Sequence, residues 1–161
     1  MASMKLRLPT LDDLPGLLAL NNAHAVELAP ETDESFGELV SVAWRVRAVD
    51  EAAGMCIAFD QDTDRDSENL NWFRARYERF AYVDRIVVDP KSRGLGLARR
   101  FYEDVIEAAR AEGHTLLCAE VNLDPPNPAS DAFHAAMGFE AVGQAKLGTR
   151  DKSVRYFTLR M

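Results

Sequence analysis

The chain has 161 residues, of which 47% are hydrophobic, and its formal net charge at pH 7 is −7. This length predicts a single domain over residues 1–161, with a core large enough to fold without a metal or a disulfide. The excess negative charge argues against binding to nucleic acid or to an anionic membrane, which favour basic surfaces, and mildly favours a cationic acceptor such as an amine.

Sequence features also bear on where the protein works. No uninterrupted apolar run approaches the ~20 residues of a membrane-spanning helix, and the start lacks the charged and apolar regions of a secretory signal. We therefore expect a cytoplasmic protein. Cys56 and Cys118 lie in apolar, strand-like runs, which favours reduced and buried thiols. Because no CxxC pattern and no paired histidines occur, we expect no metal site.

Apolar spacing and capping residues predict the elements of the first half of the chain. They are a short strand at 5–8, helices at 11–22 and 33–42, and strands at 45–49 and 54–59. Next comes the run DQDTDRDSEN at 60–69, which we interpret as a solvated loop because no packed element favours such a composition.

The segment LNWFRARYERF at 70–80 interleaves aromatic residues with arginines. One interpretation is a short amphipathic helix whose aromatic face packs on the sheet, because aromatic stripes usually serve the core. The other is a lid over an acceptor site. Nucleic-acid binding is disfavoured, since the preceding acidic run cancels the local charge.

The second half alternates strands and helices. The pattern predicts a strand at 80–88, a helix from Leu97 that Gly113 ends, a strand at 115–121, a helix at 129–137, and strands at about 140–147 and 154–160. A strand, a helix and a strand without a hairpin signal imply a parallel crossover. The order of elements predicts a mixed α/β domain with a phosphate site at a strand-to-helix turn.

That turn carries the run RGLGLA at 93–98. Unpaired backbone N–H groups and the helix dipole favour anions at such a position, and glycine lets a ligand approach the backbone closely. A Rossmann site is disfavoured because GLGLAR lacks the third glycine, and no GxxxxGK[ST] run is present. The remaining alternative is a helix that merely begins with glycines.

Two matched motifs give the chain a family resemblance. The run from 83 to 139 resembles the acetyl-CoA-binding half of the GNAT N-acetyltransferases, whose signature Arg/Gln-x-x-Gly-x-Gly/Ala is met by Arg93, Gly96 and Ala98. Downstream, Asn127 and His134 keep the spacing of the family's asparagine and helical tyrosine before Gly-Phe. The clear resemblance covers about residues 80–140.

The resemblance implies a fold and a co-substrate. The fold is a GNAT-like acyl-CoA N-acyltransferase fold of mixed α/β (α+β) class, with a central mixed sheet of six or seven strands flanked by about four helices. Residues 1–79 would form the acceptor side and 80–161 the acetyl-CoA side. The implied cofactor-binding residues are Ile86, Val87, Val88, Arg93, Gly94, Leu95, Gly96, Leu97, Ala98, Asn127, Ser130 and Phe133.

Acetyl transfer to an amine needs a base, and a carboxylate suits that role. Glu120 is the leading candidate, because it is the lone charged residue in the strand-like run LLCAEV, where desolvation would raise its pKa. The alternative is a structural ion pair between Glu120 and Arg85. Asp84 is a second candidate, expected on one face with Tyr82, Ile86 and Val88 and opposite Arg85.

Proton donation to the departing thiolate is the other requirement. His134 stands where many relatives have a tyrosine, so it either donates this proton or is a half-buried polar residue. Ser130 lies one turn earlier on the same face, where it either orients His134 or contacts the cofactor. Tyr102 is expected in the core. Relatives bind acceptors near the first two helices, where this chain has a group of residues that otherwise form a solvated face: His24, Glu27, Glu31, Asp33 and Glu34.

We therefore expect an acetyl-CoA-dependent N-acetyltransferase acting on a primary amine of a small molecule or a protein. The alternative is a noncatalytic acyl-CoA-binding sensor or regulatory module, which would keep the same phosphate turn. Neither interpretation requires nucleic acid, a membrane or a metal, and both leave a homodimer open.

Overall fold

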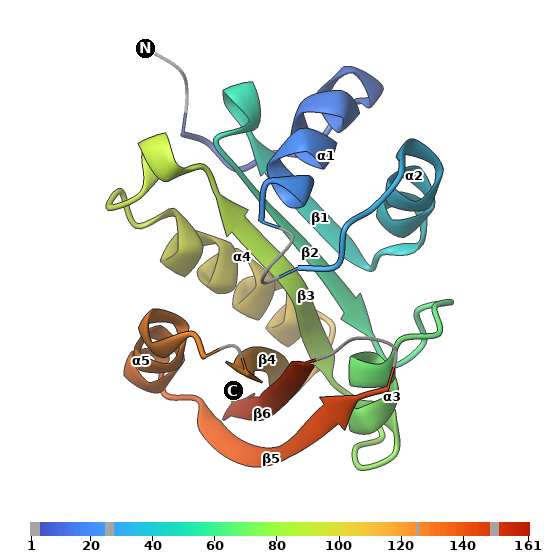
Figure 1. The fold of residues 1–161 in the computed structure, drawn as a ribbon. Helices are drawn as coiled ribbons and strands as arrows, with labels where there is room; N and C mark the ends of the chain where they lie inside the picture. The colour runs from blue at the N-terminus through green and yellow to red at the C-terminus, as the bar shows by residue number, and fades with distance from the viewer. Residues whose placement is uncertain (1–3, 25–27, 125, 149–151) are drawn as a thin grey trace.

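A computed structural model describes residues 4–24, 28–124, 126–148 and 152–161 (Figure 1). The α-helices are α1 (Leu14–Asn22), α2 (Asp33–Val42), α3 (Glu68–Arg74), α4 (Leu97–Ala111) and α5 (Pro128–Met137). The strands are β1 (Arg45–Val49), β2 (Gly54–Asp60), β3 (Ala81–Val88), β4 (Leu116–Asp124), β5 (Glu140–Leu147) and β6 (Lys152–Arg160). The predicted elements from 11 onward are thus confirmed, mostly within a few residues of their expected ends.

The strands form one mixed sheet of six, in the order β1-β2-β3-β4-β6-β5. Strands β3 and β4 are parallel, and every other neighbouring pair is antiparallel. Helix α4 connects the two parallel strands, as the absence of a hairpin signal predicted. The expected mixed α/β fold class is therefore confirmed.

Helices cover both faces of the sheet, because each face carries its own cluster of buried apolar side chains. Residues of α1, α2 and α3, such as Leu17, Leu39 and Phe73, pack on one face. Residues of α4, such as Phe101 and Val105, pack on the other. In Figure 1, α1 and α2 lie on one side of the strands and α4 on the opposite side. The sheet is thus the middle of three layers.

The aromatic segment at 70–80 belongs to the core. Phe73 and Phe80 are fully buried, and the ring of Trp72 stacks on that of Tyr156 at 4.1 Å between centroids. The guanidinium of Arg76 in turn covers Trp72, 3.7 Å from the ring centroid. These contacts support the packed interpretation over the lid. Helix α3 begins at Glu68, inside the stretch expected to be a loop, and Ser67 caps it by accepting a bond from the N–H of Leu70.

The strand expected at 5–8 is wrong in extent. Arg7 makes one antiparallel bridge with Ala48, and no named strand covers these residues. Its guanidinium instead binds Asp13 and Asp50, so the side chain joins this segment to two short 3-10 helices, Leu11–Asp13 and Asp50–Ala52, while Leu8 stays 67% exposed. Cys56 and Cys118 are free and buried, as expected.

The contact between β5 and Trp72 makes a testable prediction. A Cβ at Gly143 would lie 2.5 Å from a ring carbon of Trp72, so Gly143→Ala should destabilise the protein by about 1–3 kcal/mol through overpacking. Chemical unfolding measures the change. Gly37→Ala in α2 is the matched control, because nothing lies within 4 Å of its Cβ position; it should be stabilising by about 0.5–1 kcal/mol. Equal effects of the two substitutions would contradict this packing.

Candidate active site

The central feature of the site is the separation of β3 from β4. Their pairing, in the part of the chain that the structure describes, consists of Ala81 with Leu117 and Tyr82 with Cys118. Beyond these pairs a cavity of about 710 Å³ is lined by residues 83–88 of β3 and 120–122 of β4. The turn before α4 and the start of α5 complete its walls.

The turn before α4 has the geometry of an anion site. Gly94 and Gly96 have φ of 82° and 75°, which is the left-handed region that glycine adopts most readily, and α4 begins at Leu97. Nothing lies within 4 Å of a Cβ built at either glycine, so a ligand has room to approach this backbone. The first N–H groups of α4 have no intrahelical acceptor and add to the positive end of the helix dipole.

Most residues predicted to bind a cofactor line this cavity. They are Ile86, Val87, Val88, Arg93, Gly94, Gly96, Leu97, Ala98, Asn127, Ser130 and Phe133. Leu95 is not among the lining residues; it is 57% exposed at the tip of the turn. The side-chain oxygen of Asn127 caps α5 by accepting a bond from the N–H of Ser130, so a further contact with a ligand would use its NH₂ group.

Glu120 lies in the wall of the cavity, on β4. Its carboxylate accepts hydrogen bonds from the hydroxyl of Tyr82 at 2.5 Å and from the side-chain amide of Asn69 at 3.2 Å. Burial raises the pKa of Glu120 to about 8, and the negative charge of Asp84 adds to this rise. The bond from Tyr82 and the charge of Lys152 act in the opposite direction. Glu120 is therefore a carboxylate that can hold or release a proton near neutral pH.

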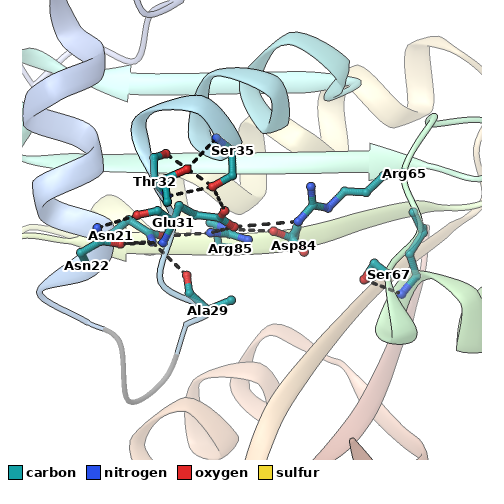
Figure 2. A network of polar contacts seen from close by, with 11 residues as sticks. Asn21, Asn22, Ala29, Glu31, Thr32, Ser35, Arg65, Ser67, Asp84 and Arg85 are labelled. Atoms are coloured by element: carbon teal, nitrogen blue, oxygen red, sulfur yellow. Dashed lines mark hydrogen bonds and ion pairs between the residues drawn. The ribbon is translucent and has the colours of Figure 1, made fainter. Parts of the chain in front are cut away.

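Arg85, the expected alternative partner of Glu120, pairs elsewhere. Its Nε donates to Asp84 at 2.7 Å, and its Nη1 donates to the side-chain oxygen of Asn21 at 2.9 Å and lies 3.5 Å from Glu31 (Figure 2). No ion pair joins Arg85 to Glu120 among the described residues. The carboxylate of Glu120 is bonded instead by the neutral donors of Tyr82 and Asn69, and the charge of Lys152 also acts on it.

The expected orientation of Asp84 is wrong, because β3 contains a bulge. On the neighbouring strand β2, Ile57 pairs with Arg85 while the next residue, Ala58, pairs with Val83. Asp84 is therefore an extra residue without a partner in that register, which interrupts the alternation of side chains along the strand.

Because of the bulge, side chains that strict alternation along β3 would put on one face of the sheet lie on two different faces. Tyr82 packs with the cluster under α1, α2 and α3, whereas Ile86 and Val88 pack with the cluster under α4 and α5. Asp84 and Arg85, expected on opposite faces, form an ion pair. A bulge also bends the strand that carries it, and here Asp84 lies two residues after Tyr82, the last residue that pairs with β4.

His134 is buried in α5 with both ring nitrogens bonded. Its Nδ1 lies 2.7 Å from the carbonyl oxygen of Ser130, which can only accept, so Nδ1 carries the proton. In the neutral ring Nε2 then accepts the hydroxyl proton of Tyr102, at 2.5 Å. Burial lowers the pKa of His134 and holds the pKa of Tyr102 well above its usual range. Ser130 does orient His134, mainly through its backbone.

A second cavity of about 290 Å³ adjoins the first and shares Leu28, Asp84, Arg85 and Glu120 with it. Its remaining lining residues are Ala29, Arg65, Asp66, Ser67, Glu68, Asn69, Leu147 and Lys152. Sequence reasoning missed Arg65 and Lys152. Arg65 lies in the acidic run interpreted as a solvated loop, where its position as the one basic residue was the available signal.

The acidic residues expected near the first two helices divide into two groups. Glu31 binds Arg85 and Arg65, whereas Asp33 and Glu34 are exposed on α2, as a solvated face requires. His24 lines the larger cavity, where its Nε2 is 3.2 Å from Arg93. Glu27 lies outside the described residues.

The described residues include neither a membrane-spanning helix nor a cluster of metal ligands. None of their helices is long and apolar enough to cross a membrane. They contain no group of three or more histidine, cysteine or acidic residues arranged to hold a metal ion.

Comparison with known proteins assigns the family. Residues 18–139 match the model of the acetyltransferase (GNAT) family, and this match spans most of the chain. The chain therefore belongs to the GNAT acetyltransferase family, and the two glycines, the separated strands and the cavity between them are its features in this protein.

Solved structures share the fold over nearly the whole chain. Ribosomal-protein-alanine N-acetyltransferase from Brucella melitensis has a TM-score of 0.72 at 21% identity, covering 98% of this chain and 99% of that chain. The acetyltransferase yncA from Salmonella typhimurium, solved with its cofactor acetyl-CoA, has a TM-score of 0.69 at 18% identity, covering 99% and 94%.

One curated relative matches in sequence. It is the L-2,4-diaminobutyric acid acetyltransferase of Wolinella succinogenes, 31% identical over 71 residues, which are 44% of this chain. The match spans only 41% of that relative's length.

The environment of Glu120 predicts how stability depends on pH. Its pKa rises from 4.5 when unfolded to about 8 when folded, so between these values the folded state binds the proton and the unfolded state does not. Glu120 should therefore lower the free energy of unfolding by up to about 1.4 kcal/mol per pH unit as pH rises through this window. Glu120→Gln should remove that slope. The free energy of unfolding of the variant, relative to that of the wild type, should therefore increase as the pH rises.

Urea unfolding at several pH values between about 5 and 8 measures this difference. Glu103→Gln, an exposed substitution of the same kind on α4, should leave the slope unchanged. Parallel pH profiles for the wild type and Glu120→Gln would contradict the raised pKa.

Proposed function

We propose that this protein transfers an acetyl group from acetyl-CoA to a primary amine of a small molecule or a protein. The observation that carries the proposal is the position of Glu120: a carboxylate with a pKa near 8 where two cavities meet. The relatives' names also point to amines, since one acetylates diaminobutyric acid and another an alanine of a ribosomal protein.

The larger cavity suits acetyl-CoA, which supplies an activated acetyl group as a thioester. The open backbone at Gly94 and Gly96, followed by the start of α4, fits a pyrophosphate. The edge of β3 at residues 86–88 offers backbone groups to the amides of the pantetheine arm, because β4 does not pair with it there. Residues before 80 then contribute most of the acceptor side.

Glu120 is the proposed base. An amine arrives mostly protonated, and the ionised carboxylate removes one N–H proton so that the nitrogen lone pair is free to attack the carbonyl carbon. The C–S bond breaks as the C–N bond forms. Asp84 remains the second candidate base, although its ion pair with Arg85 favours a supporting role, in which its charge helps to raise the pKa of Glu120.

Tyr102 is the proposed donor of the proton that the sulfur gains, and His134 takes part by holding it. An acid must stay protonated at the pH where Glu120 is ionised. The pKa of Tyr102 lies well above 10, so its hydroxyl meets this condition. Burial lowers the pKa of His134, so the imidazole is the weaker candidate. We propose that the hydroxyl, bonded to Nε2 of His134 in the free protein, turns to the thiolate in turnover and later regains a proton from solvent.

Calorimetric titration with acetyl-CoA, followed by assay of free thiol against a panel of amines, tests the function. We expect binding and amine-dependent thiol release. Glu120→Gln should lower turnover at saturating substrates by about 10²-fold or more with little change in the affinity for acetyl-CoA. Glu103→Gln serves as the control. Binding without release from any amine would instead favour the sensor alternative.

The pH dependence of turnover distinguishes the two proton donors. With Tyr102 as the acid, the rate should rise through pH about 8 as Glu120 ionises and stay high to pH about 9.5. Tyr102→Phe should lower turnover by about 10²-fold, while Tyr77→Phe, which removes the same atom from a ring outside the site, should not. A rate that instead falls steeply above pH about 8, where a histidine with a lowered pKa has lost its proton, would assign the proton to His134 itself.

A further inference from the structure

We propose that the smaller cavity binds the acceptor and selects a small amine that also carries a carboxylate, which Arg65 binds. This inference rests on the proposed function, because it names the substrate class of the same site. It also goes beyond it, since acetyl transfer alone requires no second charged group on the acceptor.

The shape of the cavity sets where the amine lies. It shares Glu120 and Asp84 with the larger cavity, so an amine at Glu120 faces the acetyl donor from the acceptor side. Its volume of about 290 Å³ is at the lower end of the range for small-molecule sites. A compact acceptor of amino-acid size therefore fits better than a length of polypeptide.

Arg65 is held at the wall of this cavity by its backbone. Its carbonyl oxygen accepts a hydrogen bond from Nη1 of Arg74 at 2.8 Å, and its N–H donates to the carbonyl of Thr63 at 2.8 Å. The position of this residue in the acidic run is thus fixed by α3. Its guanidinium extends toward Glu31 and Asp84, as Figure 2 shows.

The side chain of Arg65 is incompletely satisfied. Its Nη2 is 3.9 Å from Glu31, a long ion pair, and its Nε is buried without a hydrogen-bond partner among the described residues. A buried donor left unpaired is costly, because it gives up its hydrogen bonds with water and gains none in return. A carboxylate in the cavity would allow the guanidinium to turn and form a two-bond pair, for which its planar fork is well suited.

Neighbouring carboxylates are already committed to protein donors. Glu31 accepts from the hydroxyl of Ser35 at 2.5 Å and is shared between Arg85 and Arg65; Asp84 accepts from Arg85. Glu68 accepts from the N–H of Gly148 at 2.9 Å. Asp66, which also lines the cavity, accepts from the side-chain amide of Asn71 at 2.7 Å. Because these carboxylates have donors of their own, a carboxylate on the acceptor can pair with Arg65 while its ammonium group lies at Glu120.

Matched acceptors test the inference. Glycine, β-alanine and 4-aminobutyrate are compared with methylamine, ethylamine and propylamine, which lack only the carboxylate, by thiol release at saturating acetyl-CoA. At least one acid should exceed its amine in kcat/KM by about tenfold or more. Arg65→Gln should reduce that ratio toward one, Arg65→Lys should give an intermediate ratio, and Arg110→Gln, an exposed control, should keep the wild-type ratio.

A binding measurement separates this inference from the proposed function. Calorimetry with the preferred acid, in the presence of coenzyme A, should show binding that weakens about tenfold in Arg65→Gln, with thermal unfolding confirming that the variant is folded. Transfer to amines with no preference for acids would overturn the inference and leave the function standing. Binding that depends on Arg65 without any transfer would support the site and contradict the function. The absence of both transfer and binding would overturn both.

Discussion

The site depends on the separation of β3 from β4. Two residue pairs join these parallel strands, and the strands then part around the larger cavity. The bulge at Asp84 lies two residues after the last pair and bends β3 there. Because a strand that leaves its neighbour exposes unpaired backbone groups, the cavity carries polar groups along β3 that a ligand can satisfy.

Buried charge is organised by the same bulge. It places the side chains of Asp84 and Arg85 in contact. The guanidinium of Arg85 then binds Asp84, Asn21 and Glu31 instead of Glu120. Glu120 is bonded by the neutral hydroxyl of Tyr82 and the amide of Asn69. The bond from Tyr82 and the charge of Lys152 offset only part of the cost of burying a negative charge. The pKa of Glu120 is therefore raised because Arg85 binds other residues, and this raised pKa makes Glu120 suitable as a base.

Local signals predicted most of the fold. Apolar periodicity located α2 and β1 at their observed bounds, and the glycines at 94 and 96 indicated the turn, because such features depend on neighbouring residues. Features that depend on a distant partner were not predictable. The bulge at Asp84 is defined only by how β3 pairs with β2. The hydrogen bond between the Tyr102 hydroxyl and His134 joins two different helices, α4 and α5. Arg65 lies at its cavity because Arg74 donates a hydrogen bond to its backbone carbonyl.

The most direct test of this account is the pKa of Glu120. Titration of the protein labelled with ¹³C at the glutamate side-chain carboxyl carbon, with Glu120→Gln to assign the signal, measures it by NMR. We predict a carboxyl that titrates near pH 8. A carboxyl that titrates near 4.5, the ordinary value for glutamate, would show that Glu120 is not held in a desolvated site and would contradict its role as the base.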